Sequence, residues 1–396
     1  MIDFDKFHDR SKSASEKWNK AALKKHFGNE NVIPFWVADM EFQAPTQIID
    51  SLIQRAQNGI FGYEYKLDSL YQAIINWYST RHNLILDKKH IKFSRGILNA
   101  ISILINLHTN EGDGIIIQPP VFFEFRLLIK DNKREVIRNP LKLIDDRYQI
   151  DFDDLEKKAS DPKTKMLIIC NPHNPVGRVW NKQELERVGE ICLKHNVLVI
   201  SDEIHGDIVF KGHKYIPFAS LSKELLQISF TCLSPAKTFN IAAVTDGLVI
   251  IPNDFYRNQY DDYTGRLLIN KTNAFSVVAM ESGYAHAGPW LDELLVYLQN
   301  NLFFLKEYIK KNMPEVRVIE PEGTFLVWLD FRALGFEAKE LESFIKEHAQ
   351  IALNSGYWFG RQGAGFARMT FACPKELLEK GLLKLNKAIK KINLNC

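Results

Sequence analysis

Between residues 91 and 251, the sequence alternates short apolar runs with longer segments of helical periodicity. Most of the apolar runs are continuous over four or five residues and lack the polar alternation of a half-exposed strand. A strand of this kind is buried on both faces, which is typical of a mostly parallel sheet between two layers of helices. The predicted strands are 91–94, 114–118, 135–138, 166–170, 197–201, 228–232 and 247–251, and the predicted helices are 97–107, 121–130, 153–160 and 182–195.

The pattern changes on either side of this region. Two predicted helices, 45–57 and 67–82, precede it. Residues 1–45 are expected to be irregular, and their apolar stretch 33–42 is expected to pack along a cleft. We predict an α/β fold in which a large domain (46–288) carries the doubly wound sheet, while 1–45 and 289–396 form a smaller α+β domain. The elements expected after residue 289 are helices 290–311, 339–349 and 375–392 and strands 316–319, 323–330 and 367–372.

Length and composition narrow the class of protein. A chain of 396 residues is long enough for two domains, and 46% hydrophobic with 25% charged residues is typical of a soluble globular protein. The net charge of +3 is near balance and no basic block stands out, so nucleic acid is not an expected partner. The charged N-terminal segment lacks the apolar core of a signal peptide, and no apolar run approaches the roughly 18 residues of a membrane span. We therefore expect a cytoplasmic protein without a membrane partner.

The use of cysteine agrees with that expectation. Cysteines are odd in number and form no CxxC pair, which favours a reducing compartment and argues against a zinc site. The five cysteines are Cys170, Cys192, Cys232, Cys373 and Cys396. Three of the five lie within or beside apolar segments, where a thiol acts as a small hydrophobic group.

Four candidate functional residues each follow a predicted strand: Gly96, Asn174, Asp202 and Lys237. In doubly wound sheets, ligands bind beyond the carboxyl ends of the strands, so we expect these residues to converge on one crevice. An amide, a carboxylate and a lysine, together with Arg368 further along the chain, are the side chains that a pyridoxal 5'-phosphate (PLP) site requires.

Each of these residues also has an ordinary explanation. Lys237 alone is compatible with a surface cation, Asp202 with a helix cap or loop ion pair, and Arg368 with a salt bridge between domains. A metal site is an alternative on composition, but its candidate ligands fit no standard spacing. Those candidates are Asp202, His205, Asp207 and His213.

Several motifs resemble fold-type I PLP enzymes, the aspartate aminotransferase superfamily, in collinear order from Lys17-Trp18 to Cys373-Pro374. Within that superfamily, they resemble the MalY/PatB group of cystathionine β-lyases, also called C–S lyases. Each motif alone is weak or moderate, whereas their shared order along nearly the whole chain is strong. The motifs are Trp36-Val-Ala-Asp-Met40, Phe61-Gly-Tyr63, Gln118-Pro-Pro-Val121, Ser201-Asp-Glu-Ile-His205, Ser234-Pro-Ala-Lys-Thr-Phe-Asn240 and Phe366-Ala-Arg-Met-Thr-Phe-Ala-Cys-Pro374.

The resemblance implies how the ring of the cofactor is held. Lys237 is expected to form the covalent link and, once freed, to move the substrate Cα proton. Asp202 is expected to pair with the pyridine nitrogen and keep it protonated. Asn174 should donate to the phenolate oxygen, and His205 should face the same oxygen, where many relatives carry a tyrosine. Phe122 should stack on the ring in place of the usual tyrosine.

The phosphate is expected to bind at a helix start. The backbone N–H groups of Gly96, Ile97 and Leu98 can donate there, the helix dipole favours an anion, and Ser234 supplies a hydroxyl. Tyr63 matches the tyrosine that reaches the phosphate from the partner subunit in this family, which implies a homodimer.

One departure from the wider superfamily concerns the phosphate. Many aminotransferases carry a phosphate-binding arginine eight residues after the lysine, whereas this chain has Thr245 there. The MalY/PatB group also tends to lack this arginine. We hypothesise that Arg95 compensates. An unchanged cofactor affinity in an Arg95→Ala variant would contradict this hypothesis.

The resemblance also implies the substrate and the reaction. Arg368 is expected to clamp the substrate α-carboxylate, a type of charged hydrogen bond worth roughly 1.5–3 kcal/mol, and Asn174 and Ala38 should also contact substrate. The predicted reaction is β-elimination from an S-substituted L-cysteine such as cystathionine, which yields a thiol, pyruvate and ammonia. An aminotransferase, which shares every step through Cα deprotonation, and a regulatory protein that retains the fold are the alternatives.

Overall fold

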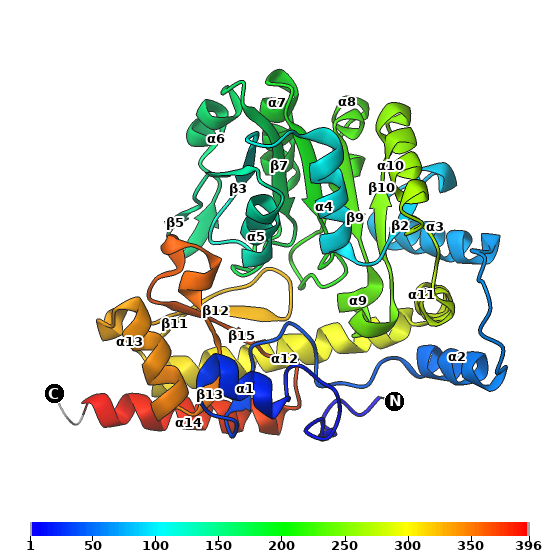
Figure 1. Ribbon diagram of the computed structural model, residues 1–396. Coiled ribbons are helices and arrows are strands. Elements are labelled where there is room, and N and C mark those ends of the chain that lie inside the picture. Colours follow the sequence, from blue (N-terminus) through cyan, green and yellow to red (C-terminus); the bar gives the residue numbers. More distant parts are fainter. Residues whose placement is uncertain (1, 394–396) are drawn as a thin grey trace.

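One sheet of seven strands organises the protein in the computed structural model, which describes residues 2–393 (Figure 1). Strand β10 is antiparallel to both of its neighbours, and the other six strands run in one direction. The mostly parallel sheet predicted from the sequence is therefore confirmed. In spatial order, the strands are β2 (Ile91–Ser94), β10 (Gly247–Ile250), β9 (Ser229–Leu233), β8 (Leu198–Asp202), β7 (Thr164–Cys170), β3 (Gly114–Ile117) and β4 (Glu135–Arg138).

Helices cover both faces of this sheet, as the continuous apolar strands predicted. Ile168 of β7 packs in one apolar cluster with α4 and α5, which lie in front of the sheet in Figure 1. Its neighbours Leu167 and Ile169 pack in another cluster with α6 and α7. Full burial of each such side chain contributes about 1.5–3 kcal/mol to stability. These helices are α4 (Ile97–His108), α5 (Phe123–Asp131), α6 (Phe152–Ala159) and α7 (Lys182–Lys194).

Four helices between residues 223 and 286 are absent from the sequence-based prediction. In α11, the buried residues Val277, Met280 and Tyr284 are joined by others on the remaining sides of the helix, so no amphipathic stripe marks it. It packs against α2 and α3, the two helices predicted before the sheet. The elements concerned are α8 (Lys223–Gln227), α9 (Pro235–Thr238), α10 (Asp254–Arg266) and α11 (Ala274–His286), with α2 (Thr46–Gln57) and α3 (Asp68–His82).

A second, antiparallel sheet lies beside the large one, and α12 (Gly288–Asn312) runs beneath both (Figure 1). Its strand order is β11, β12, β15, β14, which agrees with the α+β pattern predicted after residue 289. The predicted helix 339–349 is only partly right, because α13 ends at Ser343 and residues 344–348 form a π-helical turn. The elements are β11 (Arg317–Ile319), β12 (Leu326–Asp330), α13 (Ala338–Ser343), β14 (Asn354–Ser355), β15 (Phe366–Thr370) and α14 (Lys375–Asn393).

The prediction that residues 1–45 are irregular is wrong in two places. Helix α1 (Lys20–Phe27) begins after the N-cap Asn19 and ends at Gly28 in the left-handed conformation. Strand β1 (Ile33–Pro34) pairs in parallel with β13 (Ile351–Ala352). This pairing joins the N-terminal segment to the C-terminal part of the chain, and the division into 46–288 and 1–45 with 289–396 stays a proposal.

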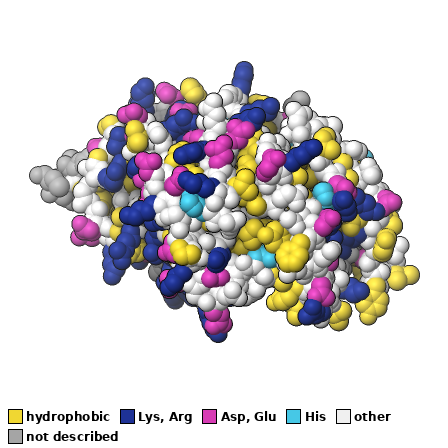
Figure 2. All heavy atoms as spheres, turned by 90° about the horizontal axis from the view of Figure 1, so that it is seen from above, with side chains coloured by type: hydrophobic (Ala, Val, Ile, Leu, Met, Phe, Trp, Pro, Cys, Tyr) yellow, Lys and Arg dark blue, Asp and Glu magenta, His cyan; other side chains and the backbone are white. Residues whose placement is uncertain are grey.

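Several further features complete the description. Strands β5 (Lys142–Ile144) and β6 (Arg147–Gln149) form a hairpin. None of the helices described here is both long and apolar enough to cross a membrane. Cys170, Cys192, Cys232 and Cys373 are buried free thiols, whereas Cys396 lies outside the described residues. On the face in Figure 2, positive and negative side chains are interspersed, with apolar side chains between them.

Candidate active site

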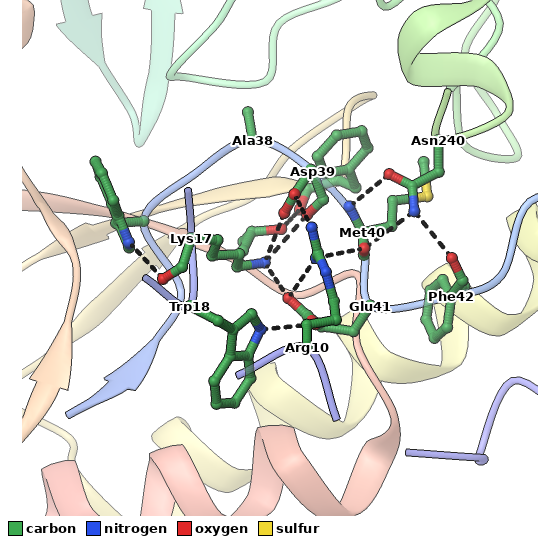
Figure 3. Close-up of polar contacts among 12 residues, drawn as sticks. Arg10, Lys17, Trp18, Ala38, Asp39, Met40, Glu41, Phe42 and Asn240 are labelled. Carbon is green, nitrogen blue, oxygen red and sulfur yellow. Dashed lines mark hydrogen bonds and ion pairs between the residues drawn. The ribbon is translucent and has the colours of Figure 1, made fainter. Parts of the chain in front are cut away.

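Residues 36–42 form a bent segment outside any helix or strand, and its part from Ala38 to Phe42 is drawn in Figure 3 with the polar side chains around it. We call this segment the strap. The Lys237 amine, on the short helix α9, donates a hydrogen bond of 2.7 Å to the Ala38 carbonyl. Asn240, which lies just after α9, also holds the strap. Its amide oxygen accepts from the Met40 N–H, and its amide nitrogen donates to the Met40 and Phe42 carbonyls. Asn240 has a φ of 58°, a conformation that asparagine tolerates better than most residues.

Burial changes the acid–base behaviour of Lys237. It lowers the pKa of the amine to about 8, because a buried ammonium loses its hydration; Asp39 and Asp202 oppose this shift, while Arg368 and Lys17 add to it. An amine with this pKa is about one-tenth unprotonated at pH 7, a far larger share than for an ordinary lysine, so it can act as a nucleophile and as a base.

This behaviour gives a direct prediction for the cofactor-free protein. Acylation of Lys237, followed by mass spectrometry of its peptide across pH, should show a midpoint near 8, because only the free amine reacts. Lysines on the surface serve as internal controls, because the pKa of an ordinary solvated lysine is about 10.4. A Lys237 midpoint in the range of the exposed lysines would contradict the prediction.

Arg368 is a buried cation whose hydrogen-bond partners are all neutral. Its guanidinium donates to the side-chain oxygens of Asn174 (3.0 Å) and Asn354 (2.7 Å) and to the Trp36 carbonyl (2.8 Å). Its Nε has no partner among the described residues, and it makes no ion pair there. Burial lowers the pKa of Arg368 to about 9. An anion entering this site would therefore meet an uncompensated positive charge.

Asp202 is the last residue of β8, His205 follows that strand, and both are buried. The Asp202 carboxylate accepts one hydrogen bond, from the Ile204 N–H at 3.2 Å, and has no ion-pair partner in the described part of the chain. Burial raises the pKa of Asp202 to about 6. Burial, with Lys237 and Arg368 nearby, lowers the pKa of His205 well below its usual value, and its Nδ1 has no hydrogen-bond partner. A neutral imidazole and a lone carboxylate are thus both available to a ligand.

The start of α4 is open to an anion. Its N-cap residue, Gly96, has a φ of 126° and no side chain that caps the helix, which leaves the first N–H groups, including those of Ile97 and Leu98, without intrahelical partners. Gly247 on β10 packs closely against the start of α4: a Cβ added at residue 247 would lie 3.1 Å from the Gly96 carbonyl carbon. Ser234 is the N-cap of α9, and its hydroxyl donates to the Asp246 carbonyl at 3.2 Å. Arg95 lies 3.8 Å from the Asp246 carboxylate.

The predicted site residues differ in whether they line a cavity. A cavity of about 820 Å³ adjoins the strap, and its lining includes Trp36, Val37, Ala38, Phe122, Lys237 and Arg368. Of the other predicted residues, Asn174, Asp202, His205 and Ser234 are buried outside that lining. Tyr63 lies on the loop between α2 and α3, where its side chain is fully exposed rather than at the cavity of its own chain.

The metal alternative finds no geometric basis. Asp207 is engaged with His82 (2.6 Å), the Trp77 indole (2.9 Å) and the Thr238 hydroxyl (2.7 Å). His213 is exposed. Among residues 2–393, no cluster of three histidine, cysteine or acidic side chains could hold a metal ion.

The sequence of the chain matches the family model for aminotransferase class I and II over residues 30–385. The chain belongs to this family. It is 39% identical to cystathionine β-lyase PatB of Bacillus subtilis over 98% of this chain and 100% of that protein. Protein MalY of Escherichia coli is 33% identical over 99% and 100%. A PLP-bound crystal structure from Clostridium difficile 630, provisionally described as an aminotransferase, is 44% identical with a TM-score of 0.96, covering 98% and 100%.

These comparisons place the chain in the PatB/MalY group of PLP-dependent enzymes. The residues present fit that cofactor. Asp202 offers a carboxylate without a cation, His205 an unpartnered ring nitrogen, and Gly96 an uncapped helix start. Lys237 offers an amine whose pKa burial lowers to about 8.

Sequence reasoning missed two contributors to the site. Asn354, which holds Arg368 from the neighbouring strand β14, lies outside every motif and gave no signal. Asp39 lies inside the motif 36–40, but no role was assigned to it. Its position between Lys237 and the buried Lys17 becomes visible only in the structure.

Proposed function

We propose that this protein is a PLP-dependent C–S β-lyase that cleaves cystathionine or a related S-substituted L-cysteine to a thiol, pyruvate and ammonia. The observation that carries the proposal is the joint placement of Lys237, with its pKa near 8, and Arg368, a buried cation without an anion, at one cavity. The full-length similarity to cystathionine β-lyase PatB supports the choice of reaction.

The bound cofactor would supply an electron sink for the carbanion at the substrate Cα. Arg368 binds the α-carboxylate and so fixes the Cα–H bond toward Lys237, with Ala38 and Asn174 completing the carboxylate site. Lys237 accepts the Cα proton at Nζ, and the electron pair of the Cβ–S bond leaves with sulfur as the thiolate. The released three-carbon enamine then reacts with water to give pyruvate and ammonia.

Other residues would hold the cofactor in place. Asp202 keeps a proton on the ring nitrogen, Asn174 and His205 face the ring oxygen, and Phe122 covers the ring. Gly96, Ile97, Leu98 and Ser234 bind the phosphate, and Arg95 remains the proposed substitute for the arginine that Thr245 replaces. The Asn174 amide oxygen accepts from Arg368, which leaves its amide nitrogen as the donor that this role requires.

The proposal is tested by one measurement on the purified protein. The visible absorption spectrum is recorded before and after addition of L-cystathionine, and pyruvate is assayed in the same sample. A cofactor band that responds to substrate while pyruvate accumulates without an added keto acid supports the lyase. A responsive band without pyruvate favours the aminotransferase, as the provisional description of the C. difficile protein does. A barrier difference of roughly 1.4 kcal/mol would change this partition tenfold.

We further propose that the active unit is a homodimer in which Tyr63 reaches the partner's site. Ile60, Phe61, Tyr63, Tyr65 and Leu67 expose large apolar side chains on one loop, more than an isolated chain usually leaves uncovered. A symmetric dimer would bury this loop twice.

Hybrid dimers test the shared site. Tyr63→Ala and Lys237→Ala variants should each be inactive, but unfolding and refolding them together should restore about a quarter of the wild-type activity, because half of the dimers then contain one intact site. Mixing Lys237→Ala with Arg368→Gln, two residues of one chain's site, is the control. This mixture should show no such recovery, because both residues act from the same subunit and no dimer then contains an intact site. Recovery here would mean that the two residues act from different subunits. No recovery with the Tyr63 pair would contradict the shared site.

A further inference from the structure

We propose that Arg10, Lys17 and Trp18 form a latch that holds the strap where its carbonyls meet Lys237 and Arg368, and that Asp39 links this latch to the Lys237 amine. None of the latch residues lines the cavity, so they would act as positioning residues. The inference rests on the proposed lyase activity only for its kinetic readout.

The strap is held from two sides, and Figure 3 shows the side that faces Arg10, Lys17 and Trp18. On the side of the cavity, the Trp36 carbonyl accepts from Arg368 at 2.8 Å and the Ala38 carbonyl accepts from Lys237 at 2.7 Å. On the other side, the Asp39 and Glu41 carboxylates face the latch. A shift of the strap would therefore move the acceptors of both functional cations together.

Lys17 is the buried centre of the latch, and Arg10 and Trp18 are partly buried beside it. The Lys17 side chain is 1% exposed, and its Nζ lies 2.7 Å from a Glu41 oxygen and 3.3 Å from an Asp39 oxygen. Arg10 lies 2.6 Å from the other Asp39 oxygen and donates to the Met40 carbonyl at 3.2 Å. The Trp18 indole donates to Glu41 at 2.9 Å.

The latch is also joined directly to the cavity wall. The Trp36 indole, which lines the cavity, donates to the Lys17 carbonyl at 3.1 Å. Two cations thus face two carboxylates in a cluster without net charge. Buried ion pairs of this kind add little to stability compared with apolar side chains of the same volume, but they fix geometry because each partner is costly to leave unpaired.

Asp39 carries the effect of the latch to the amine. Burial tends to raise the pKa of Asp39, but Lys17 and Arg10 outweigh it and lower the pKa below the usual value, so the carboxylate stays ionised. The charged groups that act on Lys237 are Asp39, Asp202, Arg368 and Lys17, and the adjacent His205 is neutral. Asp39 and Lys17 act on the pKa of Lys237 in opposite directions: Asp39 raises it and Lys17 lowers it.

The experiment combines acylation of Lys237 in the full-length, cofactor-free protein with kinetics of pyruvate formation by the loaded enzyme. Asp39→Asn should lower the pH midpoint of Lys237 acylation, and Lys17→Met should raise it. Glu41→Gln loosens the latch, but Glu41 is not among the charges that act most strongly on Lys237, so the midpoint should move less than in Asp39→Asn. All three should raise KM for the thioether several-fold more than they lower kcat, because the strap positions Arg368.

Two further variants keep the test decisive. Lys20→Met, an exposed lysine on α1, is the matched control and should change neither readout. If Lys17→Met alone does not fold, the double variant Lys17→Met/Glu41→Gln removes one buried charge of each sign and takes its place. Midpoints that stay fixed in folded Asp39 and Lys17 variants, or that move in the same direction, would overturn the proposal. If the wild type forms no pyruvate, the proposed lyase activity is refuted instead. The acylation result can still be read in that case, because acylation needs no substrate.

Discussion

The Lys237→Ala variant should form pyruvate from cystathionine at least about 10³-fold more slowly than the wild type. The substitution removes both the covalent attachment of the cofactor and the base that takes the Cα proton, and general base catalysis alone contributes about 10²–10⁴-fold. Initial rates of pyruvate formation at saturating substrate and added PLP measure the effect. The fold should survive, because the amine makes a single hydrogen bond, to the Ala38 carbonyl.

The control for this prediction is Lys211→Ala, which removes an exposed lysine and should leave the rate unchanged. A second readout is the mass of the peptide that carries residue 237 after borohydride reduction, which should include the cofactor only in the wild type. Pyruvate formation at the wild-type rate by Lys237→Ala would show that the lysine is assigned wrongly. A full biological effect of this inactive variant would favour the regulatory alternative.

The Arg368→Gln variant should separate activity from stability. We expect kcat/KM to fall about 10²- to 10³-fold, because truncating one partner of a buried charge pair costs about 2–5 kcal/mol. The free energy of unfolding without ligand should stay the same or rise, since the variant no longer buries a cation whose partners are all neutral. Steady-state kinetics and denaturant unfolding measure the two effects.

Two variants sharpen this second prediction. Arg368→Lys keeps the charge but loses the two-pronged geometry, so its kcat/KM should lie between those of the wild type and Arg368→Gln. Arg187→Gln, on the exposed face of α7, is the matched control and should change neither quantity. A large loss of stability in Arg368→Gln would mean that Arg368 is chiefly a structural residue.

The parts of the fold that sequence predicted well are those with a single burial pattern. The run Met166–Cys170 is apolar without interruption, and only a strand buried on both faces accommodates it. Because parallel strands share one carboxyl edge, the positions of Asp202 and Lys237 after their strands were enough to bring them to one site. Their individual roles remain predictions drawn from the resemblance.

Other parts depend on contacts between distant segments, which no local pattern encodes. Helix α11 is buried on most sides, so it lacks a polar face that would mark it. Lys17 resembles any surface lysine in the sequence, yet it is buried because Asp39 and Glu41, more than twenty residues away, neutralise it. Asn354 reaches Arg368 through the register of β14 and β15, which alternation of residues does not specify.

The hydrogen bond between Arg368 and the Trp36 carbonyl joins residues 332 positions apart. During synthesis, the ribosome has to release almost the entire chain before this contact can form, whereas Lys237 and its strands are available much earlier. Closure of so long a loop favours a late step in folding. A nascent chain could therefore present its reactive lysine before it can discriminate amino acids by their carboxylate, so substrate selection is the last property that the protein acquires.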